Sequence, residues 1–596
     1  MRHICYIYIK KYKILENIGI LLNSNYSVRL DLESAKLRIA KNVALPKNFW
    51  GSGIYSIAGI FGNNGAGKST TLSCLMDILL EGSAVREFDG VLVYESDGVL
   101  YVYQNLQECK LTLESDGVDV RPLKTIEKLE VFYYSGHFMP YMNNTDDQRC
   151  QELQGLYNGS DAIRIQKDLQ QYCNLDTFYM HHPLFMHLNA YVAQNNFRIC
   201  MMLANQRIRD NFEGFDLPEF VLYAPNTSGR NAWNDRYRDK PQMQLSTFKP
   251  LRFKNAKQNT LYKFVMLNIQ NVINEVVTDN HDALVLKWNE IANEKDDVLS
   301  QLEKYADYWG GDIRNALKEI YYALDLISKT HYSEALSVFY LNFREDKEAV
   351  ERLSKSFKAS RYLTSKIFDT YYAKNLDSAV NTILSSGEQE MLDLFSRIYD
   401  AVELMPQFVG NKTHPGLLLL DEAEMGYHPE WQRKYLDVLC KFVKSLMVVA
   451  GHDFQIILTS HSPLLLSDMP TSASNYLQKI GKEVHNVRDE QAETFAGNLY
   501  DLMNNNFFLT DFIGQFASAK IDSIIEKVNS AVGQKDTSNL EQLLNEVNLI
   551  GDTFIRSKLK EQLMPLAQLD EKAQLVLAME KKQEELLELK RRYDNL

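Results

Sequence analysis

The sequence predicts an α/β fold in which a helical insertion divides a sheet-based part and a helical C-terminal region follows it. Two short apolar runs, residues 54–61 and Leu417–Leu420, have the length and composition of fully buried strands. Between them, apolar residues recur at steps of three and four, as at Leu317, Ile320 and Leu324, which indicates helices. We therefore expect two separated segments of one sheet with helices between them.

The composition is that of a globular protein with about two to four packing units. The 596 residues exceed one ordinary core, and hydrophobic residues (45%) and charged residues (24%) occur at globular levels. No stretch approaches the roughly 20 uncharged apolar residues of a membrane helix, and Lys10, Lys11 and Lys13 interrupt any signal-peptide core. The seven cysteines form no C-x-x-C pair. We expect a cytoplasmic protein with reduced thiols, and the net charge of −13 disfavours a general coat for nucleic acid.

A phosphate-binding motif follows the first apolar run. Residues 62–69 satisfy G-x-x-x-x-G-K-[ST] between an expected strand and an expected helix. Glycines let the N–H groups of such a loop point inward, and the helix dipole adds positive charge. Lys68 is expected to reach the β- and γ-phosphates, Ser69 to hold Mg²⁺ and Thr70 to contact the α-phosphate. The residues expected to bind the nucleotide are Gly62, Asn63, Asn64, Gly65, Ala66, Gly67, Lys68, Ser69 and Thr70.

Short runs of alternating character surround this loop and predict hairpins. Asp-Gly pairs at 89–90, 97–98 and 116–117 separate them. From about residue 140 to 375 the period becomes helical, with tryptophans and prolines but no sustained heptads. We expect a compact helical insertion here, because a coiled-coil arm would need heptads with few aromatic residues.

Within the insertion, residues 230–263 carry nine Lys or Arg against two acidic residues, with aromatic residues between them. Two interpretations stay open. The segment either contacts unpaired nucleic acid, with basic groups on phosphates and rings on bases, or forms a solvated face with a few buried rings. The candidate contacts are Arg230, Arg236, Arg238, Lys249, Arg252, Lys254 and Lys257.

The second buried strand ends at two adjacent carboxylates. Asp421 is placed to hold Mg²⁺, and Glu422 to polarise the attacking water. A third apolar run, residues 455–460, ends at His461, and ligands gather at the carboxyl edge of an α/β sheet. The predicted catalytic residues are Lys68 and Glu422, to which the family resemblance described next adds His461, and the predicted magnesium ligands are Ser69 and Asp421.

The order of these motifs resembles that of the ABC-type ATPases, in the soluble branch with the SMC proteins, the zinc-hook repair ATPases and the OLD-family and other defence ATPases. Residues 384–388 (LSSGE) resemble the signature, 421–429 (DEAEMGYHP) the Walker B strand with its D-loop, and 459–463 (TSHSP) the switch-histidine loop. The glutamine loop has two candidates, Gln104 and residues 132–136.

The resemblance implies an ABC-type head, with a P-loop mixed sheet and an antiparallel β subdomain, that dimerises head to head around two ATP and Mg²⁺. His461 would sense the γ-phosphate, and the signature would act on the nucleotide of the other subunit. The expected parts are 1–139 (first half of the head), 140–375 (insertion), 376–510 (second half) and 511–596 (helical partner-binding region). The residues implied to act in trans are Ser385, Ser386, Gly387 and Glu388.

Residues 494–509 (TFAGNLYDLMNNNFFL), with the helical tail, resemble the PtuA-like ATPase subunits of Septu-type and retron-associated bacterial antiphage systems. Those subunits work with an HNH-type nuclease and, in retrons, with a reverse transcriptase and its RNA-DNA hybrid. The resemblance implies nucleotide-gated control of a nuclease. A last apolar stripe, from Leu575 to Leu596, either folds back on the preceding helices or docks a partner.

Three alternatives stay open. An OLD-type nuclease would need a Toprim metal site, but the last 130 or so residues hold no strand-borne Glu followed by D-x-D. An SMC-like or zinc-hook DNA-processing ATPase would need the missing coiled coil and hook. An ATP-locked scaffold with little turnover would carry the same motifs as an active ATPase.

Overall fold

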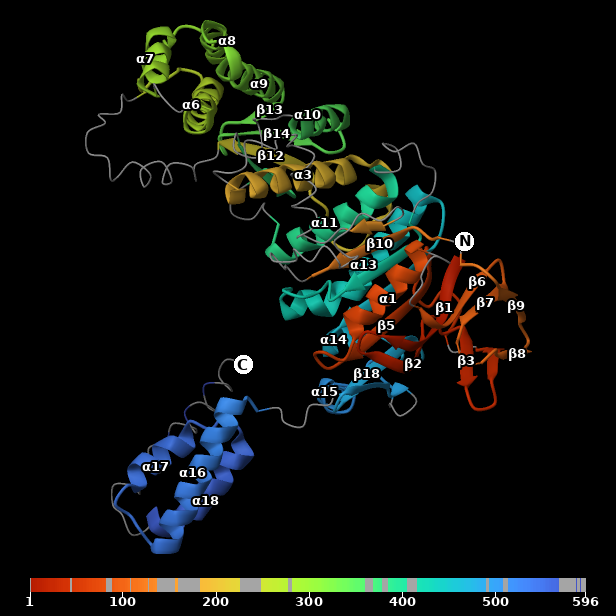
Figure 1. The fold of residues 1–596 in the computed structure, drawn as a ribbon. Helices are drawn as coiled ribbons and strands as arrows, with labels where there is room; N and C mark the ends of the chain where they lie inside the picture. Colours follow the sequence, from red (N-terminus) through yellow and green to blue (C-terminus); the bar gives the residue numbers. More distant parts are fainter. Residues whose placement is uncertain are drawn as a thin grey trace. The chain divides into compact units, whose positions relative to one another are not determined.

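The computed structural model describes residues 2–42, 45–81, 88–107, 109–126, 128–136, 156–158, 183–225, 248–276, 281–359, 368–377, 384–404, 415–488, 493–507 and 513–567, with single positions at 582, 586 and 590. The chain divides into two compact units, Met1–Phe508 and Leu509–Leu596. Figure 1 gives the labels of the helices and strands.

A seven-stranded sheet forms the centre of the first unit. Its strand order is β11-β10-β16-β17-β5-β18-β19. All neighbours pair in parallel except β18 and β19. Parallel pairing brings the carboxyl ends of β5, β16 and β17 to one edge, where the three predicted motifs begin. The strands are β5 (Ile54–Gly62), β10 (Val131–Ser135), β11 (Leu156–Asn158), β16 (Leu417–Asp421), β17 (Phe454–Ser460), β18 (Ser474–Ile480) and β19 (Glu483–Asn486).

The predicted context of the phosphate-binding loop is confirmed. Strand β5 is buried along most of its length, and helix α1 (Lys68–Glu81) follows the loop directly. Helix α1 contributes an apolar face to a second core, which includes Leu72, Leu75 and Leu79 and the strands β1 and β2. The loop therefore lies between a rigid strand and a packed helix.

Two further sheets precede and follow the loop in sequence. One has the order β2-β1-β6-β7-β9 and the other β3-β4-β8. The hairpin predicted around residues 97–98 is confirmed: Asp97 and Gly98 have φ of 54° and 80° between paired β6 and β7. These strands are β1 (Arg2–Tyr12), β2 (Leu15–Leu21), β3 (Tyr26–Asp31), β4 (Lys36–Lys41), β6 (Asp89–Ser96), β7 (Val99–Asn105), β8 (Thr112–Asp116) and β9 (Asp119–Leu123).

The other two Asp-Gly pairs do not close hairpins, so those predictions are wrong. Asp89 and Gly90 lie inside β6, opposite Lys11 and Ile9 of β1. Gly90 is needed for close approach instead of a turn, since a Cβ there would lie 2.1 Å from the carbonyl oxygen of Tyr8. Residues 116–117 connect β8 and β9, which belong to different sheets.

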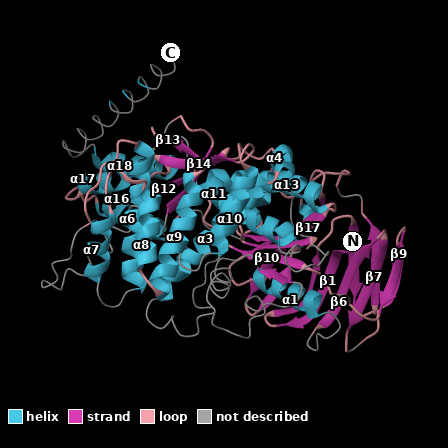
Figure 2. Ribbon diagram, turned by 90° about the horizontal axis from the view of Figure 1, so that it is seen from above, coloured by secondary structure: helices cyan, strands magenta, loops and turns pink. Residues whose placement is uncertain are grey.

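The region predicted as a helical insertion also contains a sheet. A four-stranded antiparallel sheet, β13-β14-β12-β15, lies among its helices, and Figure 2 shows these strands within a mainly helical part. The purely helical prediction is therefore wrong. The strands are β12 (Phe220–Pro225), β13 (His331–Ser333), β14 (Val338–Asn342) and β15 (Phe368–Ala373), and the helices are α3 (Pro183–Ala204), α4 (Gln206–Asn211), α6 (Ala256–Val276), α7 (His281–Ile291), α8 (Val298–Tyr308), α9 (Gly311–Ser328) and α10 (Lys347–Ala359).

This region shares one hydrophobic core with the central sheet. The core contains Phe264 and Trp288 from α6 and α7 together with Phe395, Leu418 and Phe454 from α11 (Ser386–Tyr399), β16 and β17. Helix α11 continues into a π-helix, η3 (Asp400–Leu404), and packs on α13 (Pro429–Ala450). Phe395 and Phe442 stack at 4.2 Å across this contact. After β17 come α14 (Pro463–Ser467) and, beyond β19, α15 (Leu499–Asn505).

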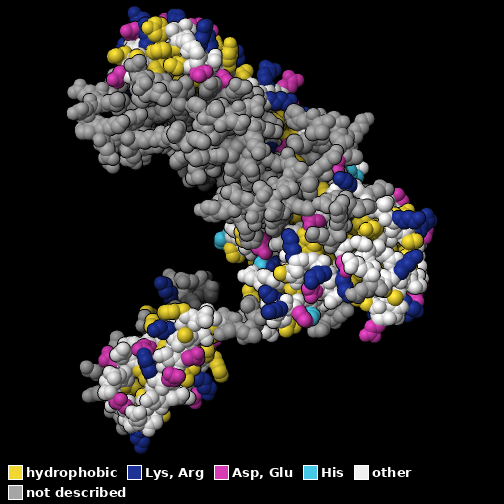
Figure 3. Space-filling model, in the orientation of Figure 1, with side chains coloured by type: hydrophobic (Ala, Val, Ile, Leu, Met, Phe, Trp, Pro, Cys, Tyr) yellow, Lys and Arg dark blue, Asp and Glu magenta, His cyan; other side chains and the backbone are white. Residues whose placement is uncertain are grey.

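The described part of the second unit is a three-helix bundle of α16 (Gln515–Gln534), α17 (Leu540–Asn548) and α18 (Thr553–Ala567). Its core includes Val528, Leu544, Val547 and Leu563. Figure 3 shows hydrophobic side chains on the visible surface of this bundle. The predicted stripe from Leu575 to Leu596 lies, apart from single positions, outside the described residues. In the described ranges, no helix combines the length and apolar character needed to cross a membrane.

Candidate active site

The glycines of the phosphate-binding loop are required by its geometry. Gly62 has a φ of 143°, and a Cβ there would lie 2.0 Å from the carbonyl oxygen of Leu477. Gly67 has a φ of 90°, and its Cβ would lie 2.5 Å from Leu15. Gly65 also has positive φ, 73°. Residues with a side chain would therefore be strained at these positions. The loop places the first turn of α1 toward the carboxyl edge of the sheet.

No local sequence pattern predicts the contact that Leu15 makes with the phosphate-binding loop. Leu15 begins β2, and the hairpin between β1 and β2 brings it over Gly67. This contact joins the five-stranded sheet to the phosphate-binding loop. A contact between segments far apart in the sequence depends on how two sheets pack, which local sequence patterns do not encode.

Lys68 lies buried at the centre of the edge, with an exposed fraction of 5%. Its ammonium contacts Nε2 of His461, lies 3.7 Å from Oε1 of Glu422 and donates to the carbonyl oxygen of Gly62 at 3.3 Å. Burial lowers the pKa of Lys68, while Glu422 and Asp421 act to raise it. The three residues predicted to be catalytic are therefore brought together.

The two predicted magnesium ligands also meet. Ser69 Oγ donates to Oδ1 of Asp421 at 3.0 Å. Thr459 Oγ1 donates to the same oxygen at 2.6 Å, and the Tyr133 hydroxyl donates to Oδ2 at 3.1 Å. A hydroxyl and a carboxylate side by side provide the hard oxygen ligands that Mg²⁺ prefers, with phosphate and water completing its shell. Tyr133 and Thr459 lie in two predicted motif segments, 132–136 and 459–463, but no role was predicted for either hydroxyl.

Glu422 is held in a backbone conformation that residues with a side chain rarely adopt. Its φ is +50°. Its N–H donates to the carbonyl oxygen and to Oγ1 of Thr459, both at 3.1 Å. Gly136, at the end of β10, packs on its carbonyl, because a Cβ at residue 136 would lie 2.2 Å from that oxygen. Strain of this kind costs about 1–3 kcal/mol and persists where neighbours impose it. Here it aims the carboxylate at Lys68 and His461.

His461 contacts both the ammonium of Lys68 and the carboxylate of Glu422. Its Nε2 is 3.2 Å from Oε1 of Glu422, and its side chain is one-third exposed. It directly follows β17 and precedes α14. Both ring nitrogens lie near the Lys68 ammonium, with Nδ1 at 3.4 Å, and part of the imidazole is exposed to solvent.

Glu424 is a third carboxyl at the same edge, which the sequence analysis did not assign. It is buried, and burial raises its pKa to about 7, with Ser460 acting in the opposite direction. Its Oε1 accepts a hydrogen bond from the hydroxyl of Ser460. The sequence feature that could have identified Glu424 is its place two residues after Glu422, in the segment 421–429.

The segment resembling a signature forms a capped helix start. Ser385 and Ser386 are exposed, and Gly387 lies against the ring of Trp431, where a Cβ would come within 2.1 Å of Cδ1. Glu388 accepts from the N–H of Ser385 at 2.9 Å, and its other oxygen pairs with Lys374 at 2.6 Å. Both serines are therefore exposed at the helix N-terminus, but the Ser385 hydroxyl also donates to Glu388 at 2.9 Å and accepts from its N–H at 3.4 Å.

Neither candidate for the glutamine loop brings a glutamine to this edge. Gln104 lies in β7 of another sheet, and its Oε1 accepts from the N–H of Leu111 at 2.9 Å. Residues 132–136 lie beside β16, but it is Tyr133 that reaches Asp421.

The basic segment is described only in part. Arg230, Arg236 and Arg238 lie outside the described residues. Lys249, Arg252 and Lys254 are exposed, and the ammonium of Lys257 lies 5.7 Å from the ring centre of Phe339. Phe253 and Tyr262 belong to the core, each 8% exposed. For these two rings the second interpretation holds, because both are packed in the core and their faces do not lie open to bases.

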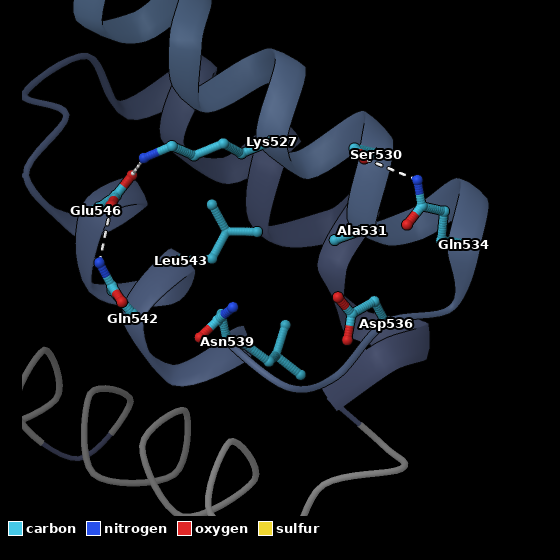
Figure 4. A pocket seen from close by; sticks show the side chains of 10 residues that line it. Lys527, Ser530, Ala531, Gln534, Asp536, Asn539, Gln542, Leu543 and Glu546 are labelled. Atoms are coloured by element: carbon cyan, nitrogen blue, oxygen red, sulfur yellow. Dashed lines mark hydrogen bonds and ion pairs between the residues drawn. The ribbon is translucent and has the colours of Figure 1, made fainter.

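A pocket of about 370 Å³ lies on the second unit, between α16 and α17. Lys527 and Glu546 form an ion pair of 2.7 Å at its wall, and Leu543 points into it (Figure 4). The Lys527 and Glu546 charges satisfy each other, so the pocket does not offer a free pair of charged groups.

The family model described as "AAA ATPase domain" matches residues 4–466 of the chain. A search of curated proteins gave no match. Among solved structures, the one titled "Structure of the recombination mediator protein RecF-ATP in RecFOR pathway" is similar over 82% of this chain and 99% of that chain, with 12% sequence identity and a TM-score of 0.20. The matched residues 4–466 include the phosphate-binding loop, Asp421, Glu422 and His461.

Proposed function

The chain belongs to the AAA ATPase domain family and is an ATPase, and on this premise we propose that it is the ATP-hydrolysing subunit of a bacterial antiphage defence complex. In this proposal two ABC-type heads dimerise around ATP and control a partner nuclease of the Septu or retron type. The family membership supports ATP and Mg²⁺ as the ligands. The remaining parts of the proposal rest on the site geometry and on the resemblance of residues 494–509.

The observation that carries the hydrolytic part is the strained Glu422 beside Lys68 and His461. The loop amides and Lys68 bind the phosphates, and Ser69 and Asp421 would hold Mg²⁺, which supplies charge neutralisation between the β- and γ-phosphates. Glu422 accepts the proton of the attacking water as that water bonds to the γ-phosphorus. The bond from the γ-phosphorus to the bridging oxygen breaks at the same time, ADP takes the electron pair, and His461 donates a hydrogen bond to the γ-phosphate.

The ion pair between Lys68 and Glu422 adds a nucleotide-dependent step. The ammonium of Lys68 lies 3.7 Å from the Glu422 carboxylate that we propose as the base. A bound γ-phosphate carries more charge and competes for Lys68. Binding therefore releases Glu422 to face the water, which ties the base to the presence of ATP.

Dimerisation is supported by the start of α11. Ser385 and Ser386 are exposed at the N-terminus of α11, where the helix dipole favours anions, although Ser385 is also part of a capping box with Glu388. We propose that a second copy presents these two serines to the γ-phosphate held by Lys68. Gly387 lets the helix pack on Trp431, and Glu388 caps it, so these two residues set the direction of the helix start.

Control of a partner is supported by the part of the chain beyond the family match. The C-terminal bundle exposes Phe516 (78%), Leu549 (85%) and Phe554 (69%) to solvent. A contiguous apolar surface patch marks a protein docking site, and we propose that these three side chains belong to one. We propose that an HNH-type nuclease docks on this bundle, with a reverse transcriptase as an additional partner in a retron.

The first test uses Glu422→Gln, which keeps the shape of the base and removes its proton affinity. We expect hydrolysis to fall by roughly 10²-fold or more, while Mg-ATP holds the protein as a dimer in light scattering. Exposed Glu483→Gln is the control. Hydrolysis at the wild-type rate would exclude Glu422 as the base, and a variant that stays monomeric with bound ATP would exclude the dimer.

The second test addresses the partner. The chain is expressed with its genomic neighbours, and plaque counts are compared for wild type and Lys68→Ala. We expect protection by wild type only, together with an HNH-type nuclease in the purified complex. Equal protection by both proteins would contradict nucleotide control, and a complex without a nuclease would favour the ATP-locked scaffold or a DNA-processing ATPase.

A further inference from the structure

Glu424 makes contacts that neither Asp421 nor Glu422 makes. It is 4% exposed and lies in the turn after β16. Its carboxyl oxygen accepts from the hydroxyl of Ser460, the residue just before His461. The same Ser460 oxygen accepts from the N–H of Ser462, just after His461, at 2.8 Å. One carboxyl thus fixes both sides of the histidine through a single hydroxyl.

A second path returns from the histidine loop to the turn. Ser462 Oγ donates to Oε1 of Gln432 at 3.0 Å, and Gln432 Nε2 donates to the carbonyl oxygen of Tyr427 at 3.0 Å. Tyr427 N–H in turn donates to the carbonyl oxygen of Glu424 at 3.2 Å. These bonds form a closed ring through residues 424, 427, 432, 460 and 462. The ring joins the turn after β16 to the loop that carries His461.

The environment of Glu424 suits it to hold a structure and not to act as a base. The ionisable groups around it are Asp421, Glu422, Lys68 and Tyr435. Burial and the two neighbouring carboxylates raise its pKa. Two carboxyls in unlike surroundings commonly divide their roles, and only Glu422 contacts Lys68 and His461.

We infer that Glu424 is a positioning residue for ATP hydrolysis, because its bond to Ser460 holds His461 in the alignment that Glu422 and Lys68 require. This inference rests on the proposed hydrolysis by Glu422 and His461. The residue does not touch the nucleotide. It should therefore affect the rate of the chemical step more than the affinity for ATP.

The experiment compares Glu424→Ala, Glu424→Gln and exposed Glu483→Ala in steady-state hydrolysis. Because a misplacement of about 1 Å can cost on the order of 100-fold, we expect Glu424→Ala to lower kcat by roughly 10- to 100-fold with KM unchanged within about twofold. Glu424→Gln keeps an oxygen that accepts from Ser460 and should stay within about threefold of wild type. Glu483→Ala should behave as wild type.

Ser460→Ala deletes the same bond with a smaller change and serves if Glu424→Ala does not fold. It should reproduce the loss of kcat. An unchanged kcat in Glu424→Ala or Ser460→Ala would overturn the inference, as would an equal loss in Glu424→Gln or an effect confined to KM. A wild-type protein without hydrolysis would instead refute the proposed function, so the two failures are distinguishable.

Discussion

Different kinds of interaction stabilise the carboxyl edge of the central sheet and the C-terminal bundle. At the edge, buried polar groups satisfy one another: Asp421 accepts from three hydroxyls, and Lys68 lies among Glu422 and His461. In the bundle, the core consists of apolar residues such as Leu544 and Leu563. The edge therefore depends on hydrogen bonds and charge, whereas the bundle depends on apolar burial.

This difference separates stability from activity. A buried charge or a strained φ lowers stability unless its neighbours compensate it, and the edge contains both. Apolar burial stabilises by about 25 cal/mol per Å² and requires no alignment of charge. Changes at the edge should therefore alter hydrolysis most, and changes in the bundle should alter folding most.

Lys68→Ala should give the largest effect. It removes the cation that binds the phosphates, so we expect kcat/KM for ATP to fall by about 10³-fold or more. Exposed Lys482→Ala is the control. The measurement is hydrolysis together with thermal unfolding, which should change much less than activity. Retention of activity within tenfold would break the assignment of this edge to ATP.

Leu544→Ala tests whether the C-terminal bundle depends on apolar burial for its stability. Leu544 is 1% exposed, and truncation of a buried leucine costs about 2–5 kcal/mol of stability. Leu549→Ala is the matched control, because Leu549 is 85% exposed and its loss should cost less than about 0.5 kcal/mol. Denaturant unfolding measures both. Hydrolysis should be unchanged in both, and a loss of activity in Leu544→Ala would couple the bundle to the edge.

Most of the edge could be predicted from sequence because its motifs are local. The glycines of residues 62–67 follow a fixed spacing, and Asp421, Glu422 and His461 end short apolar runs. Parallel pairing of β5, β16 and β17 then brings these ends together. The predicted residues meet because each was tied to a strand end.

The rest depends on contacts between distant segments. Tyr133 and Thr459 look like ordinary strand residues, and only the order β10-β16-β17 places their hydroxyls on Asp421. The Asp-Gly pair at 89–90 predicts a turn, but the approach of β1 requires glycine within a strand at Gly90. The sheet of the insertion was missed because its strands are three to six residues long and interrupt a helical pattern.

The pH dependence of stability gives a third test. Glu424 has a pKa raised from 4.5 to about 7, so the folded state favours its protonated form. Protonated Glu424 therefore adds roughly 3 kcal/mol to the free energy of unfolding below pH 4.5. This contribution is lost as pH rises through 7. The measurement is the free energy of unfolding of wild type minus that of Glu424→Gln at pH 5 and pH 8.

His3 makes this subtraction necessary. Burial lowers its pKa from 6.5 to about 4. Its contribution is therefore present above pH 6.5 and lost as pH falls through 4, opposite in sign to that of Glu424. Because both proteins contain His3, its effect cancels in the difference. A difference that does not change between pH 5 and pH 8 would contradict the raised pKa of Glu424.

Gly387→Ala probes the contact between α11 and α13. The added Cβ would lie 2.1 Å from the Trp431 ring, so we expect a loss of about 1–3 kcal/mol. Combining it with Trp431→Leu should cost less than the sum of the two single changes. Gly533→Ala in α16 is the matched control, because it meets nothing within 4 Å and should stabilise by about 0.5–1 kcal/mol. Equal effects at both glycines would contradict the packing described here.

The smallest expected effect isolates the strain at Glu422. Glu422→Gln and Glu422→Asn both remove the base, and both should abolish most hydrolysis. They differ in backbone preference, since asparagine adopts positive φ more readily than other residues with side chains. We therefore expect Glu422→Asn to be more stable than Glu422→Gln by about 0.5–1 kcal/mol. Thermal unfolding of the two variants measures the difference.

The same pair of substitutions at Glu526, an exposed position inside α16, should give the opposite order. Glutamine is the better helix former, so Glu526→Gln should be the more stable variant by a few tenths of a kcal/mol. The reversal would follow from backbone conformation alone, because both pairs exchange the same two amides. If asparagine were favoured at neither position, then the φ of +50° at Glu422 would store no strain, and its orientation toward Lys68 would need another cause.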